Sequence, residues 1–137
     1  MSESSPNILG HRVLVVDDDL ANREALVDLL REEGFAADAV CDGRQALAWL
    51  IRHVPQTGLI LLDLMMPVMD GDSFLFAKER DLAIADVPVV VMTASGPHVC
   101  DQVTAQHRVR QCIEKPLTLA SLIGAVTSCW ADAAARV

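Results

Sequence analysis

Short apolar runs and helical patterns alternate along the chain. Residues 59–62 and 89–91 are unbroken apolar runs, which is typical of strands covered on both faces of a sheet. Strands are predicted at residues 12–16, 35–40, 59–63, 88–93 and 112–114. Between and after them, apolar residues recur at the spacing of one helix face. This spacing predicts helices at residues 21–33, 44–53, 72–80, 97–107 and 119–130.

Several residues refine these boundaries and faces. Gly34 is expected to end the first helix, and Asp19 to cap its beginning. The second helix is expected to turn Ala46, Leu47, Leu50 and Ile51 inward, and Trp130 to lie at the outer end of the last helix's apolar stripe.

Alternation of this kind is typical of βαβ units with a parallel sheet. The expected fold class is α/β: a doubly wound, five-stranded parallel sheet in the order 2-1-3-4-5 with five helices, flavodoxin-like. We expect a flexible N-terminal tail over residues 1–9, one domain over residues 10–133, and no output domain.

Chemically distinctive residues stand where the predicted strands end. Asp17 and Asp18 follow the first strand, Asp63 closes the third, Thr93 ends the fourth and Lys115 follows the fifth. Carboxyl ends of parallel strands share one edge, where open α/β sheets bind ligands. Close carboxylates repel each other, and a hard divalent cation such as Mg²⁺ relieves that repulsion. Together with a hydroxyl and an ammonium group, they predict a phosphoryl-binding pocket.

Composition narrows the classes of partner. The net charge is 11 − 19 = −8, which argues against nucleic-acid binding through phosphate neutralisation. The hydrophobic share is 52%, yet no apolar run approaches a membrane span and the N-terminus lacks signal-peptide features. We therefore expect no membrane association and a cytoplasmic location.

The cysteines and histidines show no metal-binding spacing. Cys41, Cys100, Cys112 and Cys129 contain no CxxC pair, so zinc and, without a secretory signal, disulfides are not expected. Buried free thiols are the expected state of all four. The scattered histidines are assigned no metal role.

The strand-tip motifs resemble those of the receiver domains of two-component response regulators, the single-domain chemotaxis regulators included. The resemblance covers about residues 10 to 131. It rests on the acidic pair after Val15-Val16, on the segment from Leu62 to Gly71, on Val91-Met92-Thr93-Ala94 and on Glu114-Lys115-Pro116. The intervals of that family are also kept, with 93 − 63 = 30 and 115 − 93 = 22.

The resemblance implies a role for each matching residue. Asp63 would accept a phosphoryl group from a histidine kinase, a phosphotransfer protein or a small acyl phosphate. Asp18 and Asp63 would bind Mg²⁺, or Mn²⁺ as a substitute, together with the backbone carbonyl of Met65. Asp17 would act mainly through metal-bound water.

The remaining implications concern the phosphoryl group and its readout. Thr93 and Lys115 would contact phosphoryl oxygens, and the Lys115-Pro116 peptide bond would be cis. The chain would be a phosphorylation-dependent signalling switch with slow self-dephosphorylation, rather than a conventional enzyme. A downstream protein would bind the face running from Pro97 to Trp130.

Three positions, at two places in the chain, depart from the family pattern. Cys112 stands three residues before Lys115, where an aromatic residue is usual, and Arg108-Val109 replaces a pair of small residues. The hypothesis that follows is an intact phosphorylation site with an altered readout, in which the signal passes through residues 97–110 by another rearrangement.

Other functions remain open from the sequence. A degenerate receiver would act as a phosphorylation-independent interaction module. A metal-dependent phosphohydrolase would require a second acid two residues after its nucleophile, where this chain has Met65. A flavin carrier would require a phosphate-binding loop after the first strand, and the sequence has no such loop there.

Overall fold

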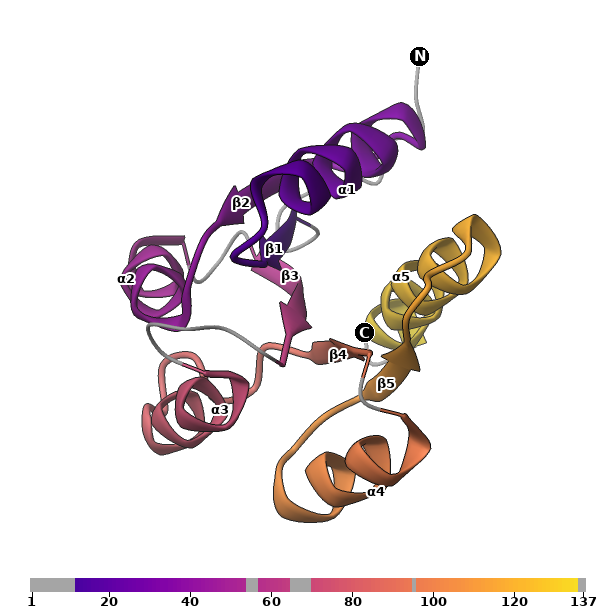
Figure 1. Cartoon of the computed structure of the whole chain (residues 1–137). Helices are drawn as coiled ribbons and strands as arrows, with labels where there is room; N and C mark the ends of the chain where they lie inside the picture. The colour runs from indigo at the N-terminus through magenta and orange to yellow at the C-terminus, as the bar shows by residue number, and fades with distance from the viewer. Residues whose placement is uncertain (1–11, 54–56, 65–69, 95, 136–137) are drawn as a thin grey trace.

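The computed structural model describes residues 12–53, 57–64, 70–94 and 96–135, with the side chains of 130–135 excepted. Its strands are β1 (Arg12–Val16), β2 (Ala37–Val40), β3 (Thr57–Asp63), β4 (Val89–Thr93) and β5 (Gln111–Glu114). Its helices are α1 (Leu20–Glu32), α2 (Gly43–His53), α3 (Gly71–Arg80), α4 (Pro97–Gln106) and α5 (Leu119–Ala135). Strands and helices alternate strictly, as the apolar pattern predicts (Figure 1).

The strands form one parallel sheet in the order β2-β1-β3-β4-β5. The predicted fold class and strand order are therefore confirmed. The register pairs Val16 with Leu62, Asp63 with Met92 and Thr93 with Glu114. The carboxyl ends of β1, β3, β4 and β5 therefore lie along one edge of the sheet.

Two apolar cores cover the two faces of the sheet. Alternate strand residues such as Val13, Leu61 and Met92 pack with α1 and α5, whereas Leu14, Leu62 and Val91 pack with α2, α3 and α4. Figure 1 shows α1 and α5 on one side and the other three helices on the opposite side. The side chains of 59–62 and 89–91 are completely buried, which explains why these strands are unbroken apolar runs.

Except at the end of α5, the predicted helix and strand ends agree with the structure to within about two residues. Helix α5 runs to Ala135, five residues beyond the predicted end at residue 130. The difference at the start of β2 has a local cause. Asp19 caps α1 by accepting the Asn22 N–H at 3.1 Å, and Gly34 has the positive φ of 95° expected of a helix stop. The Phe35 N–H then donates to the Leu30 carbonyl at 3.0 Å, which completes the end of the helix. Residues 35 and 36 therefore precede β2 instead of belonging to it.

Ile51 is exposed, with 60% of its surface accessible, so its predicted inward orientation is wrong. Ala46 and Leu50 are fully buried and fill the core between α2 and the sheet. The expected tail at residues 1–9 and the Trp130 side chain lie outside the described residues. Among the helices that are described, none has the length and hydropathy required of a membrane span.

The prediction of four free thiols is wrong for two cysteines. Cys100 on α4 and Cys112 on β5 form a disulfide. The fold places these positions side by side, although they are 12 residues apart in sequence and show no motif spacing. Cys129 is a buried thiol outside any disulfide, as expected, and Cys41 is also unbridged but only half-buried.

Candidate functional site

The predicted strand-tip acids come together. Asp17 follows β1 immediately, Asp18 is next, and Asp63 ends the adjacent strand β3. One carboxylate oxygen from each of the three residues lies within 4.8 Å of those of the other two. Asp17 and Asp63 are buried, whereas Asp18 is exposed. Three like charges thus converge at the boundary between the sheet edge and solvent.

Asp17 provides a test of whether this cluster suits a cation. Its Oδ1 accepts the Asp19 N–H at 2.9 Å, while its Oδ2 is buried without a hydrogen-bond partner among the described residues. Burial raises the pKa of the Asp17 carboxyl, the Asp19 N–H opposes that rise, and the charge of Asp63 adds to it. A divalent cation would satisfy the unpaired oxygen and offset the repulsion, and an all-oxygen donor set suits Mg²⁺. The residues present therefore fit the metal.

Lys115 brings a positive charge to the same place. Its Nζ lies 3.5 Å from Asp63 Oδ2. Its backbone N–H donates to the Thr93 carbonyl at 2.8 Å, which ties the ends of β4 and β5 together. Thr93 itself is completely buried at its strand tip, and the Lys115-Pro116 bond is cis, as expected.

A close backbone contact fixes the beginning and end of the loop after Asp63. The Leu64 N–H donates to the Met92 carbonyl at 3.1 Å, and the Gly71 N–H donates to the Leu64 carbonyl at 2.9 Å. A Cβ on Gly71 would lie 2.6–2.9 Å from atoms of Leu64, two of them backbone atoms, so only glycine fits there. Asp70 then caps α3 by accepting the Ser73 N–H at 2.8 Å.

The contact between Gly71 and Leu64 is not among the predictions from the sequence, although the Asp70-Gly71 pair is a signal for it. Met65, expected to offer its backbone carbonyl to the metal, lies outside the described residues.

A groove of about 300 Å³ opens beside the site. Asp17 and Lys115 line it, together with Asn22, Ala25, Leu26, Pro116 and Leu117. It runs between α1 and the segment that joins β5 to α5. A ligand or protein side chain that enters it meets both Asp17 and Lys115.

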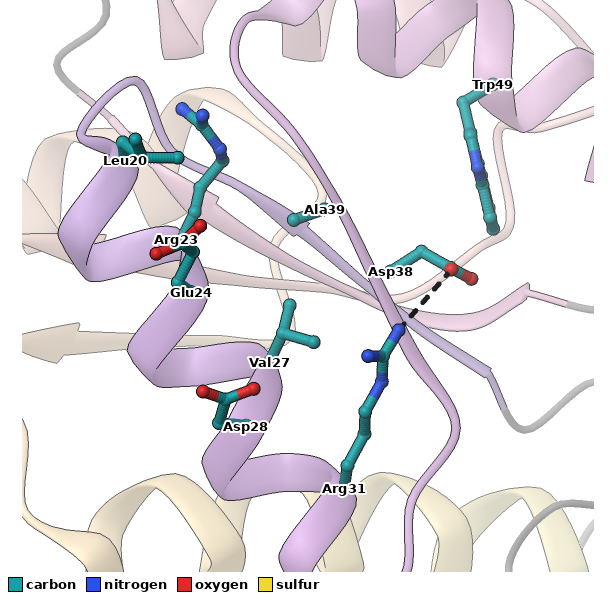
Figure 2. A pocket seen from close by; sticks show the side chains of 9 residues that line it. All are labelled: Leu20, Arg23, Glu24, Val27, Asp28, Arg31, Asp38, Ala39 and Trp49. Atoms are coloured by element: carbon teal, nitrogen blue, oxygen red, sulfur yellow. Dashed lines mark ion pairs between the residues drawn. The ribbon is translucent and has the colours of Figure 1, made fainter.

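A larger hollow of about 660 Å³ lies between α1, β2 and α2, away from the strand tips (Figure 2). Figure 2 shows the Arg31 guanidinium directed toward the Asp38 carboxylate, 4.0 Å away. Asp38 also pairs with Arg12. None of the residues at the strand tips lines this hollow, and its central acid is already paired. We therefore assign the chemistry to the strand-tip cluster.

The cluster has the components of a phosphoryl-transfer site. Three acids suit a divalent cation, Asp63 offers a nucleophilic oxygen, and Lys115 and Thr93 offer a positive charge and a hydroxyl.

The response regulator receiver domain family model matches residues 13–127. The DNA-binding response regulator MtrA of Mycobacterium tuberculosis H37Rv is 42% identical over 83 residues, which cover 61% of this chain and 34% of MtrA. The chain thus spans about a third of the length of the curated relatives it matches.

Solved structures give the same result. The receiver domain of the sensor histidine kinase PA1611 from Pseudomonas aeruginosa has a TM-score of 0.77 at 26% identity, covers 87% of this chain and 96% of its own, and holds a magnesium ion in its active-site cleft. The chemotaxis protein CheY4 of Vibrio cholerae has a TM-score of 0.76 at 25% identity, covering 86% of this chain and 97% of its own.

The family match covers 115 residues (127 − 13 + 1) of the 137, well over half of the chain. This chain belongs to the response regulator receiver domain family.

Proposed function

We propose that Asp63 is the phosphoacceptor of a signalling switch, with Asp17 and Asp18 as metal-binding residues and Thr93 and Lys115 as phosphoryl-binding residues. Phosphorylation-dependent signalling is the general function of the family. The observation that carries the assignment is the position of Asp63. Its Oδ2 lies 3.5 Å from the Lys115 ammonium, and its carboxylate belongs to the acidic cluster with Asp17 and Asp18.

Receiver domains typically bind Mg²⁺ in their active sites. In this chain Asp18 and Asp63 would hold the ion directly and Asp17 largely through water, with Mn²⁺ as a possible substitute. The bound ion supplies charge neutralisation for the incoming phosphoryl oxygens. The Met65 backbone carbonyl is proposed as a further ligand from the family pattern alone.

Asp63, Lys115 and Thr93 each have a separate role in the proposed phosphoryl transfer. An Asp63 carboxylate oxygen attacks phosphorus and forms a P–O bond, while the bond from phosphorus to the donor's nitrogen or oxygen breaks and its electron pair leaves with the donor. The Lys115 ammonium lies 3.5 Å from Asp63 Oδ2 before attack and pairs with a phosphoryl oxygen afterwards. The Thr93 hydroxyl donates to another phosphoryl oxygen. The acyl phosphate is lost slowly by hydrolysis, which resets the switch.

The donor and the target are proteins in this proposal. Receiver domains interact with histidine kinases, and a kinase or a phosphotransfer protein would reach Asp63 from the groove beside Asp17 and Lys115. A downstream protein would bind the face from Pro97 to Trp130, in the cytoplasm.

A phosphorylation-independent interaction module is the competing function. The observation that favours it is the covalent tie between α4 and β5, which restrains a segment of the proposed output face. The complete set of acids, hydroxyl and lysine favours the switch.

Intact-mass measurement after treatment with acetyl phosphate separates the two. With Mg²⁺ the chain should gain the mass of one phosphoryl group, and without Mg²⁺ the gain should fall sharply. Asp63→Asn should abolish it, while Asp28→Asn, which changes an exposed acid on α1, should leave it intact. A chain that gains no mass, or an Asp63→Asn variant that still gains it, would rule out the switch.

A further inference from the structure

The Cys100–Cys112 disulfide joins helix α4 to the edge strand β5. The two Cα atoms are 5.6 Å apart, within the usual range for a disulfide. Both residues are half-buried, so neither is enclosed in the core. Figure 1 shows α4 beside β5 at the end of the sheet. The bond is therefore a covalent tie between two partly exposed residues at the end of the sheet.

The noncovalent anchoring of α4 is sparse. Within its ten residues, all of them described, Val103 is the buried side chain. Its N-cap is Gly96, which offers no side-chain hydrogen bond. The other end is held better, because the His107 ring lies 3.2 Å from both Asp72 and Glu79 of α3. The disulfide thus secures the half of α4 that lacks this anchor.

That half of the helix is connected to the proposed phosphoryl site. α4 begins at Pro97, shortly after Thr93, and Cys112 precedes Lys115 by three residues (115 − 112). The strands that carry Thr93 and Lys115 are paired, and the Lys115 N–H binds the Thr93 carbonyl at 2.8 Å. The disulfide therefore joins the helix that follows Thr93 to the strand that precedes Lys115.

We propose that Cys100 and Cys112 form a reversible thiol-modification site: thiol–disulfide exchange there sets how far phosphorylation of Asp63 changes the α4 surface. The oxidised protein holds α4 against β5 and gives a small response. The reduced protein frees α4 and gives a large one. Disulfides in reducing compartments are usually transient and redox-sensing, which agrees with this role. The inference rests on the proposed function, since it assigns regulation to the same switch.

The exchange needs a low-molecular-weight thiol or disulfide as co-reactant. In reduction, a small-molecule thiolate attacks one cysteine sulfur, the S–S bond breaks, and the other cysteine leaves as a thiolate. A second small thiolate attacks the resulting mixed disulfide and releases the second cysteine. Two electrons pass to the cysteine pair, two protons complete its thiols, and the two small thiols become one disulfide. Oxidation by a small disulfide is the same sequence reversed.

The test compares amide hydrogen exchange in the full chain after equilibration with oxidised glutathione or with dithiothreitol. Thiol alkylation followed by intact mass reports how many cysteines are free in each state. Reduction should free two more thiols and speed exchange over residues 97–106 at least about tenfold, since a lost crosslink restores chain freedom. Acetyl phosphate with Mg²⁺ should then change exchange over these residues more in the reduced protein than in the oxidised one.

Variants separate the disulfide from other effects of the reagents. Cys100→Ser and Cys112→Ser should each behave like the reduced protein under both conditions. Cys41→Ser removes a half-buried free thiol and should respond like the unmodified chain. A bridge that never forms under oxidant, or equal exchange and equal phosphorylation response in both states, would overturn the inference. If no phosphoryl group is gained in either state, the proposed function fails, and this result is distinct from a missing redox effect.

Discussion

At the scale of single residues, Asp17 carries the strongest electrostatic signal of the site. Its carboxylate is buried beside Asp63, one of its oxygens is unpaired among the described residues, and its pKa is raised chiefly by burial. A buried acid with an unpaired oxygen destabilises the metal-free protein, and a bound cation would offset this effect.

Asp17→Asn tests this directly. It removes one of three converging charges, and its amide can donate to Asp63, so without divalent ions the variant should be more stable by about 1 kcal/mol. The increase in melting temperature that Mg²⁺ produces should be largely lost. Thermal unfolding with and without MgCl₂ measures both effects, with Asp28→Asn as the control. A variant less stable than the parent, or equally stabilised by Mg²⁺, would contradict the assignment.

Lys78 is a buried cation outside the site. It is 1% exposed, its Nζ donates to the Ala85 carbonyl at 2.8 Å, and burial lowers the pKa of Lys78 to about 8. In the unfolded chain the pKa of Lys78 has the usual lysine value of 10.5. Between these two values the unfolded chain binds a proton that the folded chain has released, so stability rises with pH.

Urea unfolding should show this rise as a gain of about 2 kcal/mol between pH 8 and pH 10 from this residue. Lys78→Met keeps the buried stem and removes the titrating group, so it should lose that gain. The chain has no tyrosine, and the other titrating groups are common to both proteins, so the difference between them isolates Lys78. Identical pH dependence in both would show that Lys78 is not the cause.

At the scale of elements, the loop between β3 and α3 is set by the contact of Gly71 with Leu64. Gly71→Ala places a methyl group against backbone atoms 2.8–2.9 Å away. The substitution should cost about 1–3 kcal/mol of stability and slow phosphorylation, because the loop begins directly after Asp63. Urea unfolding and the rate of phosphoryl gain from acetyl phosphate report the two effects.

Gly124→Ala is the matched control. A Cβ at Gly124, on α5, has no atom within 4 Å, so the variant should be up to about 1 kcal/mol more stable and should phosphorylate normally. If both alanine variants behave alike, the close contact has no special role.

The ends of helices and strands are predicted correctly from the sequence where they depend on residues close by in the chain. Asp19 and Gly34 mark the ends of α1 because capping depends on neighbouring backbone groups. The pattern wrongly places Phe35 in a strand, because apolar character does not distinguish a strand start from the residue that closes a helix. Ile51 fits an inward stripe by spacing, yet 60% of its surface is exposed, so its side of α2 faces solvent.

At the scale of the whole molecule, parallel topology makes the site predictable. Once strands alternate with helices, their carboxyl ends must share an edge, and residues as distant as Asp17 and Lys115 meet there. The disulfide was not predictable in this way, because it depends on which residue of α4 faces β5. The contacts of His107 are not predictable for the same reason, because its partners Asp72 and Glu79 lie on another helix, α3.

The two-sided core also places the site at a boundary between rigid and adjustable parts. β3 and β4 are buried on both faces and hold Asp63 and Thr93 in fixed register, whereas α4 contributes one buried side chain among its described residues. Changes at the phosphoryl site are therefore expected to appear in α4 and not in the central strands.

The most direct measurement is to locate the phosphoryl group by chemical trapping. Borohydride converts an aspartyl phosphate to homoserine, and mass spectrometry of the peptides then identifies the modified position. After treatment with acetyl phosphate and Mg²⁺, homoserine should replace aspartate at position 63 alone. Homoserine at Asp17 or Asp18, or at no position, would contradict the assignment of Asp63 as the phosphoacceptor.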